Sequence, residues 1–412
     1  MRMSNDGQDS HILGLKSRVC DNVDARRDEL IGVALDIHRN PEIAFMEHRS
    51  SRLLASHLEA AGLNVQHPAF GMDTALSCEV GNGNGAVVGL IGEYDALPEI
   101  GHACGHNIIG TASMGATLAL ADLGADLPGR VRFVGTPAEE SGGGKITLAR
   151  NGAFEGLDCV VMVHPADRDL QSFPIIARAA ARAVFHGRPA HAAAGPEHGI
   201  NALDALVTAY SAIAAWRQQL AHGCRIHAII TEGGVATNVI PERAVGEFVI
   251  RAPDRIMLEA MRTRLDDCLN AGALAAGANV EIAWDENDYH ELITSWPLAD
   301  AYRRNAERLG REFDEMGDLP FGFAASTDFG NLSHLVPAIH PMVKAMPRGT
   351  EFHTLDFARG SASEAGMNAL VDSAKAMAMT AIDFMCDPAL RETVARRFAA
   401  RPVPVGQKGE HA

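Results

Sequence analysis

Two side chains that commonly bind metals stand two residues apart in this sequence. Cys104 and His106 belong to the run His102-Ala-Cys-Gly-His106, and a tight glycine-containing loop would let both reach one ion. The adjacent Glu139 and Glu140 follow further along the chain. One of these carboxylates can bind metal while the other takes a proton from metal-bound water. These are the parts of a hydrolytic metal centre.

The segments around these residues predict an α/β domain with a mostly parallel sheet. Three short apolar runs are typical of buried parallel strands, and a helix-forming stretch lies between the first two. The runs cover 86–91, 131–134 and 159–163, and the helical stretch covers 108–123.

Polar residues follow each of the three predicted strands. Glu93 and Asp95 follow the first, Glu139 and Glu140 the second, and His164 the third. Ligands bind at the carboxyl ends of the strands in such sheets, so we expect these side chains to meet at one edge. Taken alone, Cys104 and His106 would more often be a buried cysteine beside a helix-capping histidine. The carboxylates at neighbouring strand ends favour the metal site instead.

A second domain is inserted into the first. Its pattern is strand-helix-strand-strand-helix-strand, which is typical of a split βαβ unit. The predicted strands are 179–186, 225–232, 247–251 and 280–284, and the helices are 201–220 and 254–276. A strand at 338–343 and a long helix at 361–385 then resume the first pattern. We therefore predict a catalytic domain formed by residues 1–175 and 293–412, with an inserted domain at 176–292.

Four further residues are candidates for the site. His191 lies at a predicted strand-to-helix turn and could donate a hydrogen bond to a developing oxyanion, or it could cap a helix. Asn238 and Arg251 could fix a substrate carboxylate, although a surface salt bridge competes as an explanation for Arg251. His353 lies on a distant loop, and its position alone assigns it no role.

The composition restricts the partners and the compartment. A formal charge of −16 over 412 residues disfavours nucleic acid and anionic membranes as partners. No apolar run approaches the length of a membrane span, and the polar segment 1–17 lacks a signal-peptide core. Seven cysteines at irregular spacing form no disulfide framework. We therefore expect a cytoplasmic protein that acts on a small molecule.

Together, these motifs resemble metallopeptidase family 20, the amidohydrolases that include aminoacylases, indole-acetyl-amino-acid hydrolases and glutamate carboxypeptidases. The likeness runs through nearly the whole chain, and it is strongest to the cysteine-containing branch near the domain-2 dipeptidase and aminobenzoyl-glutamate hydrolase group. The segments that carry it are 102–106, 135–140, 162–165, 326–331 and 352–354.

The resemblance implies a zinc-exopeptidase-like α/β catalytic domain with an inserted ferredoxin-like α+β domain that serves as lid and dimerisation domain. It also implies two divalent ions per subunit, zinc or manganese, and a homodimer or higher homo-oligomer. The implied metal ligands are a bridging Cys104 with His106, Glu140, His164 and His353.

The remaining roles implied by the resemblance are catalytic and substrate-binding. Glu139 would be the general base and acid, and His191 would polarise the scissile carbonyl, often from the partner subunit. Asn238 and Arg251 would hold the substrate carboxylate. The more distant aminoacylases carry His-x-Asp where this chain has Glu93-Tyr-Asp95, so we expect Asp95 to orient His106 without itself binding the metal.

The function predicted from these residues is metal-dependent hydrolysis of the amide bond of a dipeptide or N-acyl amino acid. Two alternatives stay open. An activated water could instead displace ammonia from an activated aromatic amine on the same fold, or the protein could be a non-catalytic metal-dependent binding protein. Placement of Glu139 beside the ligands argues against the binding protein, because a purely structural metal site needs no base.

Overall fold

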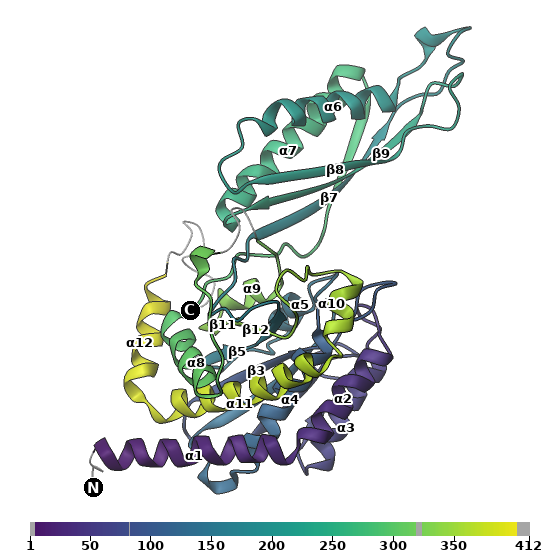
Figure 1. Cartoon of the computed structure of the whole chain (residues 1–412). Coiled ribbons are helices and arrows are strands. Elements are labelled where there is room, and N and C mark those ends of the chain that lie inside the picture. Colours follow the sequence, from purple (N-terminus) through teal and green to yellow (C-terminus); the bar gives the residue numbers. More distant parts are fainter. Residues whose placement is uncertain (1–4, 82, 319–323, 402–412) are drawn as a thin grey trace. The chain divides into compact units, whose positions relative to one another are not determined.

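The chain divides into two compact units. The computed structural model describes residues 5–81, 83–318 and 324–401 (Figure 1). The first unit comprises Met1–Pro174, Leu292–Phe323 and Thr327–Ala412, and the second comprises Ile175–Glu291 with Ala324–Ser326. The two main boundaries between the units, at 174/175 and 291/292, each lie one residue before the boundary expected from the sequence. The short return of residues 324–326 to the second unit was not expected.

A six-stranded sheet forms the centre of the first unit, in the order β1-β2-β4-β3-β5-β11. Strands β4, β3, β5 and β11 pair with one another in parallel. Strand β2 pairs antiparallel with β4 and with the edge strand β1. The bounds are β1 Val65–Gln66, β2 Leu76–Val80, β3 Val87–Glu93, β4 Arg130–Thr136, β5 Cys159–Val161 and β11 Ala338–Ile339. Every residue of β3 is buried, as expected for a strand with helices on both faces of its sheet.

A separate pair of parallel strands, β6 (His164–Ala166) and β12 (Met342–Lys344), continues the chain just beyond β5 and β11. The predicted strand at 338–343 is therefore divided in two, and the predicted strand at 159–163 already ends at Val161. His164 thereby becomes the first residue of a new strand rather than a residue after a strand.

Helices cover the sheet of the first unit (Figure 1). Helix α4 packs against β3 and lies beside α11, and it is buried around almost its whole circumference, which explains its continuous apolar sequence. The bounds are α1 Asn5–Ala25, α2 Arg27–Arg39, α3 His48–Ala60, α4 His106–Ala121, α5 Gly144–Arg150, α8 Trp296–Arg308, α9 Phe329–Ser333, α10 Leu355–Gly360, α11 Glu364–Cys386 and α12 Pro388–Ala399. No described helix is both long and apolar enough to cross a membrane.

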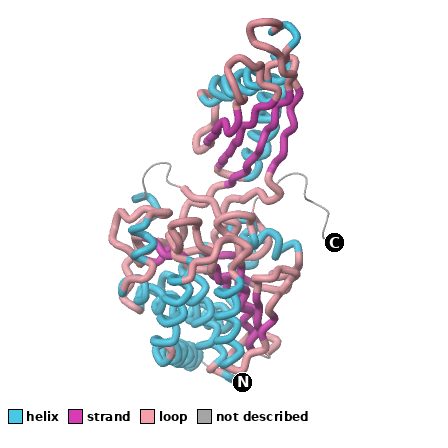
Figure 2. The backbone as a smooth tube through the Cα atoms, turned by 90° about the vertical axis from the view of Figure 1, so that its right-hand side faces the viewer, coloured by secondary structure: helices cyan, strands magenta, loops and turns pink. Residues whose placement is uncertain are grey.

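The second unit is an antiparallel sheet with two helices on one face (Figure 2). Its strand order is β10-β7-β9-β8, and its elements follow the predicted strand-helix-strand-strand-helix-strand sequence. The bounds are β7 Ala177–His186, α6 Ala202–Arg217, β8 Arg225–Glu232, β9 Arg243–Ala252, α7 Arg255–Ala276 and β10 Asn279–Trp284. Asn201 and Asp254 cap the two helices through their side chains, which fixes both starting points.

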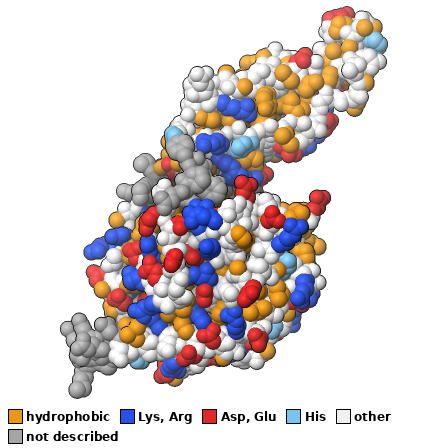
Figure 3. All heavy atoms as spheres, in the orientation of Figure 1, with side chains coloured by type: hydrophobic (Ala, Val, Ile, Leu, Met, Phe, Trp, Pro, Cys, Tyr) orange, Lys and Arg blue, Asp and Glu red, His pale blue; other side chains and the backbone are white. Residues whose placement is uncertain are grey.

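The surfaces of the two units differ in composition. Acidic and basic side chains intermix over the visible face of the first unit (Figure 3). The first unit also contains ion pairs such as Arg26 with Asp122, at 2.9 Å. Hydrophobic side chains gather on the visible face of the second unit (Figure 3). Its exposed large hydrophobic residues include Val207, Ile229, Ile230, Val235 and Leu274.

Candidate metal centre

The loop after β3 positions Cys104 and His106 at the carboxyl end of the sheet. Gly105 between them has a positive φ of 80°, and a Cβ atom there would lie 2.8 Å from Cγ of Pro165. Glycine alone therefore fits this turn without strain or a steric clash. Helix α4 begins directly at His106, so its buried first turn holds the imidazole in place.

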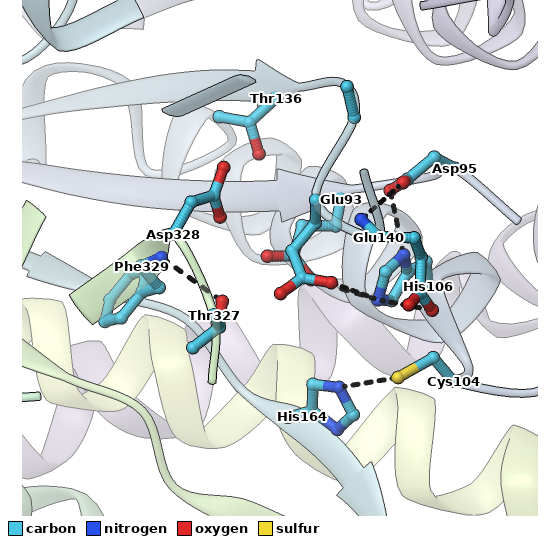
Figure 4. Close-up of polar contacts among 12 residues, drawn as sticks. Glu93, Asp95, Cys104, His106, Thr136, Glu140, His164, Thr327, Asp328 and Phe329 are labelled. Carbon is cyan, nitrogen blue, oxygen red and sulfur yellow. Dashed lines mark hydrogen bonds and ion pairs between the residues drawn. The ribbon is translucent and has the colours of Figure 1, made fainter. Parts of the chain in front are cut away.

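Asp95 connects His106 to the neighbouring strand-end loop. Its Oδ1 accepts from His106 Nδ1 at 2.9 Å, and its Oδ2 accepts the backbone N–H of Glu140 at the same distance (Figure 4). The neighbouring His106 lowers the pKa of Asp95 below its ordinary value, although burial by itself would raise it. An ionised Asp95 fixes the ring so that Nε2 is left to face the site, which is the orienting contact expected from the sequence.

The structure brings all five predicted metal ligands together in two groups that share Cys104. The first group contains Cys104, His106 and His164, and the second contains Cys104, Glu140 and His353. Within each group, one possible ligand atom of every residue lies within 4.8 Å of the others. A thiolate common to two such groups is the arrangement that a bridging ligand requires.

The two outer histidines have defined orientations. His164 Nδ1 lies 2.8 Å from the carbonyl oxygen of Pro165, and its Nε2 lies 3.4 Å from Cys104 Sγ (Figure 4). Because Nδ1 donates to this carbonyl, Nε2 is the nitrogen that faces the thiol. His353 Nε2 lies 3.5 Å from Glu140 Oε2, and its backbone N–H donates to the carbonyl of Ala103 at 3.0 Å.

The electrostatics of these residues favour a cation. Burial alone would lower the pKa of His106, yet the carboxylates of Asp95 and Glu93 raise it well above its ordinary value. Burial, then the charge of Glu140, raises the pKa of Cys104, so a nearby cation is needed to hold the thiolate. His106 Nε2 and Glu140 Oε1 are buried without a hydrogen-bond partner among the described residues. The donor set therefore fits a metal ion.

Glu139 lies beside the ligands but belongs to neither group that contains Cys104. Its Oε2 is 3.8 Å from His106 Nε2, and the residue is 8% exposed. Burial raises the pKa of Glu139 well above its ordinary value, and the charges of Glu93 and Glu140 raise it further. A carboxyl group with a raised pKa at a site edge is suited to accept and return a proton.

A buried lysine lies close enough to Glu139 to interact with its charge and was not among the site residues predicted from the sequence. Lys145 Nζ is 2.5 Å from Glu93 Oε1 and 2.7 Å from Asp328 Oδ1, and all three residues are at most 1% exposed. We call these three residues the Lys145 cluster. Glu93 Oε2 also lies 3.4 Å from His106 Nε2, so the cluster adjoins the site (Figure 4). Of its members, Asp328 lies in the motif 326–331 and Glu93 follows the first predicted strand, whereas no sequence signal assigned Lys145 to the site.

The three remaining predicted residues lie in the second unit. His191 Nδ1 accepts the backbone N–H groups of Ala193 and Ala194, each at 3.2 Å, so the neutral ring carries its proton on Nε2. Asn238 lies next to this loop, because its carbonyl accepts the N–H of Ala192. Arg251 lies near the end of β9 and donates to Ser326 Oγ at 2.8 Å rather than joining a surface salt bridge among the described residues. Their approach to the metal ligands stays a prediction.

Known proteins resemble this chain over most of its length. A model of peptidase family M20/M25/M40 matches residues 89–381. An Xaa-Arg dipeptidase of Mus musculus is 39% identical over 403 residues, which cover 94% of this chain and 93% of the relative. One of the p-aminobenzoyl-glutamate hydrolase subunits of Escherichia coli (strain K12) is 27% identical over 444 residues, covering 90% of this chain and 92% of the relative.

Solved structures show the same fold. A dinuclear metal binding peptidase from the M20 family of Bacillus subtilis superposes with a TM-score of 0.68 at 19% identity, over 88% of this chain and 99% of that one. These comparisons confirm three predictions made from the sequence: the family, the two-domain fold, and a hydrolase that acts on peptide or amide bonds.

Proposed function

Because the chain belongs to peptidase family M20/M25/M40, we propose that it is a metal-dependent amidohydrolase of dipeptides or N-acyl amino acids. The observation that carries this proposal is the pair of ligand groups that share Cys104, with the carboxyl group of Glu139 beside them. This arrangement would supply sites for two cations and a proton acceptor at the carboxyl end of one sheet.

The proposed cofactors are two divalent ions per subunit. Cys104, His106 and His164 would hold one ion, and Cys104, Glu140 and His353 would hold the other. When bound, such ions lower the pKa of water and polarise the scissile carbonyl. The thiolate and imidazoles suit zinc, while the carboxylate also allows manganese. The Bacillus subtilis structural neighbour is itself a dinuclear metal binding peptidase, which supports two ions over one.

The residues of the chain would act in the following order. Glu139 takes a proton from the attacking water and delivers it to the leaving amine, a role that its raised pKa suits. The Nε2–H of His191 donates to the carbonyl oxygen as that oxygen gains negative charge. Arg251 and Asn238 hold the substrate carboxylate, for which the guanidinium offers two parallel donors.

The proposed substrate class is a dipeptide with a basic carboxyl-terminal residue. The support is the 39% identical relative, which is an Xaa-Arg dipeptidase, whereas the aminobenzoyl-glutamate hydrolase is more distant at 27%. Aminobenzoyl-glutamate therefore serves as the comparison substrate.

The test is a hydrolysis panel with purified protein. The panel holds Xaa-Arg and Xaa-Lys dipeptides, N-acyl amino acids, aminobenzoyl-glutamate and amino-substituted benzoates, each with zinc, with manganese and with chelator. We expect chelator-sensitive release of arginine or lysine. Release of ammonia from an aromatic amine with the peptides intact would support the deaminase instead, and no turnover of any compound would contradict an enzyme of this class.

We further propose a homodimer formed through the second unit. Several large hydrophobic side chains are exposed there, and Ile229 and Ile230 lie on the edge strand β8. An exposed apolar edge strand is suited to pair with another copy. Analytical ultracentrifugation of the wild type and of Ile229→Lys tests this, because a wild-type monomer would refute the dimer.

We also propose a cytoplasmic location, with which the seven free cysteines are consistent.

A further inference from the structure

Besides His353, whose φ is 60°, two residues near the site have a left-handed backbone that is rare for non-glycine residues. Phe45 has a φ of 63° and Ala138 has a φ of 60°. The backbone N–H groups of both residues donate to the same atom, Oε1 of Glu47, each at 2.9 Å. Glu47 is completely buried. One carboxylate therefore holds both unfavourable conformations in place.

Ala138 directly precedes Glu139, so its backbone determines where the Glu139 side chain points. Its carbonyl accepts the N–H groups of Gly143 at 3.1 Å and Gly144 at 3.2 Å, which closes the loop on the far side. On the other flank of Glu139, the N–H of Glu140 donates to Asp95. The backbone N–H groups of the residues before and after Glu139, Ala138 and Glu140, thus both donate to buried carboxylates.

The side chain of Glu47 has no role in the helix that follows it. Glu47 occupies the N-cap position of α3, yet its side chain makes no cap hydrogen bond. Glu42 performs that task instead, because its carboxylate accepts the N–H groups of Arg49 at 2.9 Å and Ser50 at 2.7 Å. Burying a carboxylate is costly, and α3 does not account for that cost.

We propose that Glu47 is a positioning residue for Glu139, acting through its hydrogen bond to the N–H of Ala138. The inference rests on the proposed function, in which Glu139 transfers the proton. Without the acceptor at this place, Ala138 loses the contact that offsets its left-handed conformation, and the backbone before Glu139 relaxes. Because proton transfer requires close alignment, a displacement of the carboxyl group lowers kcat while leaving substrate contacts unchanged.

Two variants separate the reach of the Glu47 side chain from its charge. Glu47→Gln keeps an acceptor oxygen at the same distance from the backbone but removes the charge. Glu47→Asp keeps the charge but is one methylene shorter, which withdraws the oxygen from Ala138. We expect Glu47→Asp to lose about 100-fold in kcat with KM and metal content unchanged, as a displacement of about 1 Å can cost. Glu47→Gln should retain most of the activity.

Glu42→Asp is the matched control, because it shortens a carboxylate of the same segment whose side-chain hydrogen bonds all go to α3, namely to the backbone N–H groups of Arg49 and Ser50 and to the hydroxyl of Ser50. It should lower stability without changing kcat. Full kcat in Glu47→Asp, or a larger loss in Glu47→Gln than in Glu47→Asp, would overturn the proposal.

Amide exchange gives a readout that needs no activity. Hydrogen–deuterium exchange of a peptide spanning residues 136–141 should accelerate in Glu47→Asp and not in Glu47→Gln or Glu42→Asp. If the wild type hydrolyses no amide but exchange follows this pattern, the proposed function fails while the hydrogen-bond role of Glu47 stands. Unchanged exchange in Glu47→Asp would refute that role whether or not the enzyme is active.

Discussion

Replacing Lys145 with methionine should destabilise the first unit in a strongly pH-dependent way. The Lys145 cluster places one ammonium between two carboxylates, at 2.5 Å from Glu93 and 2.7 Å from Asp328, with every member at most 1% exposed. Burial raises the pKa of Asp328, and Lys145 opposes that shift. Methionine has a similar volume but no charge, so the variant keeps two buried carboxylates without their cation. Breaking a buried ion pair in this manner costs about 3–5 kcal/mol.

The dependence on pH follows from the same carboxylates. In the variant, the loss of Lys145 raises the pKa of Asp328 in the folded state further above its unfolded value. The folded variant therefore binds more protons than the unfolded chain between those two values, and its stability falls as the pH rises through that interval. At acidic pH, protonation of Asp328 neutralises the charge that Lys145 balances in the wild type. The loss of stability in Lys145→Met relative to wild type should therefore be small near the unfolded pKa of Asp328, about 4, and should reach its full size at neutral pH.

The assay is denaturant unfolding of the metal-free protein at several pH values, monitored by circular dichroism. Lys375→Met is the matched control, because Lys375 pairs with Asp24 at 2.7 Å and that aspartate is 52% exposed. Such a pair contributes at most about 1 kcal/mol. Lys145→Met combined with Asp328→Asn should regain part of the lost stability. A deficit in Lys145→Met that is absent at neutral pH, or that does not change with pH, would refute the reasoning.

Three other predictions concern the site. Glu139→Gln should lose about 10²–10⁴-fold in kcat while retaining its metal, by steady-state kinetics and metal analysis; near-full activity would contradict the base assignment. Cys104→Ser and Glu140→Gln should each bind less metal than wild type in equilibrium dialysis, because each removes a proposed ligand. Unchanged metal content would refute the assignment of these ligands. Burial, followed by the charge of Asp95, raises the pKa of Glu47 to about 7 from 4.5, so metal-free wild type should lose about 3 kcal/mol of stability as the pH rises from about 4.5 to above 7. Other buried carboxyl groups with raised pKa values, such as Glu139, add to this slope, so Glu47→Gln should reduce the loss of stability between pH values below and above that interval by about 3 kcal/mol in denaturant unfolding. An equal slope in both proteins would show that Glu47 does not contribute to it.

Much of the fold was predictable because most elements carry a clear hydrophobic period. The apolar runs of β3, β4 and β5 and the amphipathic pattern of α6 and α7 appear close to their predicted positions. Several elements escaped prediction, among them α1, α8 and β2. Helices α1 and α8 have mostly polar sequences, and β2 is an antiparallel strand of five residues whose sequence shows no long apolar run.

The residues proposed as metal ligands could be selected from the sequence because they follow strands or belong to a recognisable motif, and the structure places them close together. Glu47 and Lys145 could not be assigned from the sequence, since their roles depend on backbone and side-chain contacts with residues far along the chain. Glu47 contacts Ala138, and Lys145 contacts Asp328. No local pattern indicates that a glutamate at a helix start will turn its carboxylate toward a distant loop.

The distribution of the metal ligands along the chain has a consequence for biosynthesis. With the ligands proposed above, Cys104 leaves the ribosome long before His353, and at roughly 5–20 residues per second the interval is about tens of seconds. Strands β11 and β12, which pair with β5 and β6, also emerge late. A nascent or prematurely terminated chain therefore lacks both a ligand and the strands beside it. With this ligand set, peptide hydrolysis would be restricted to nearly finished molecules, and incomplete chains would be inactive.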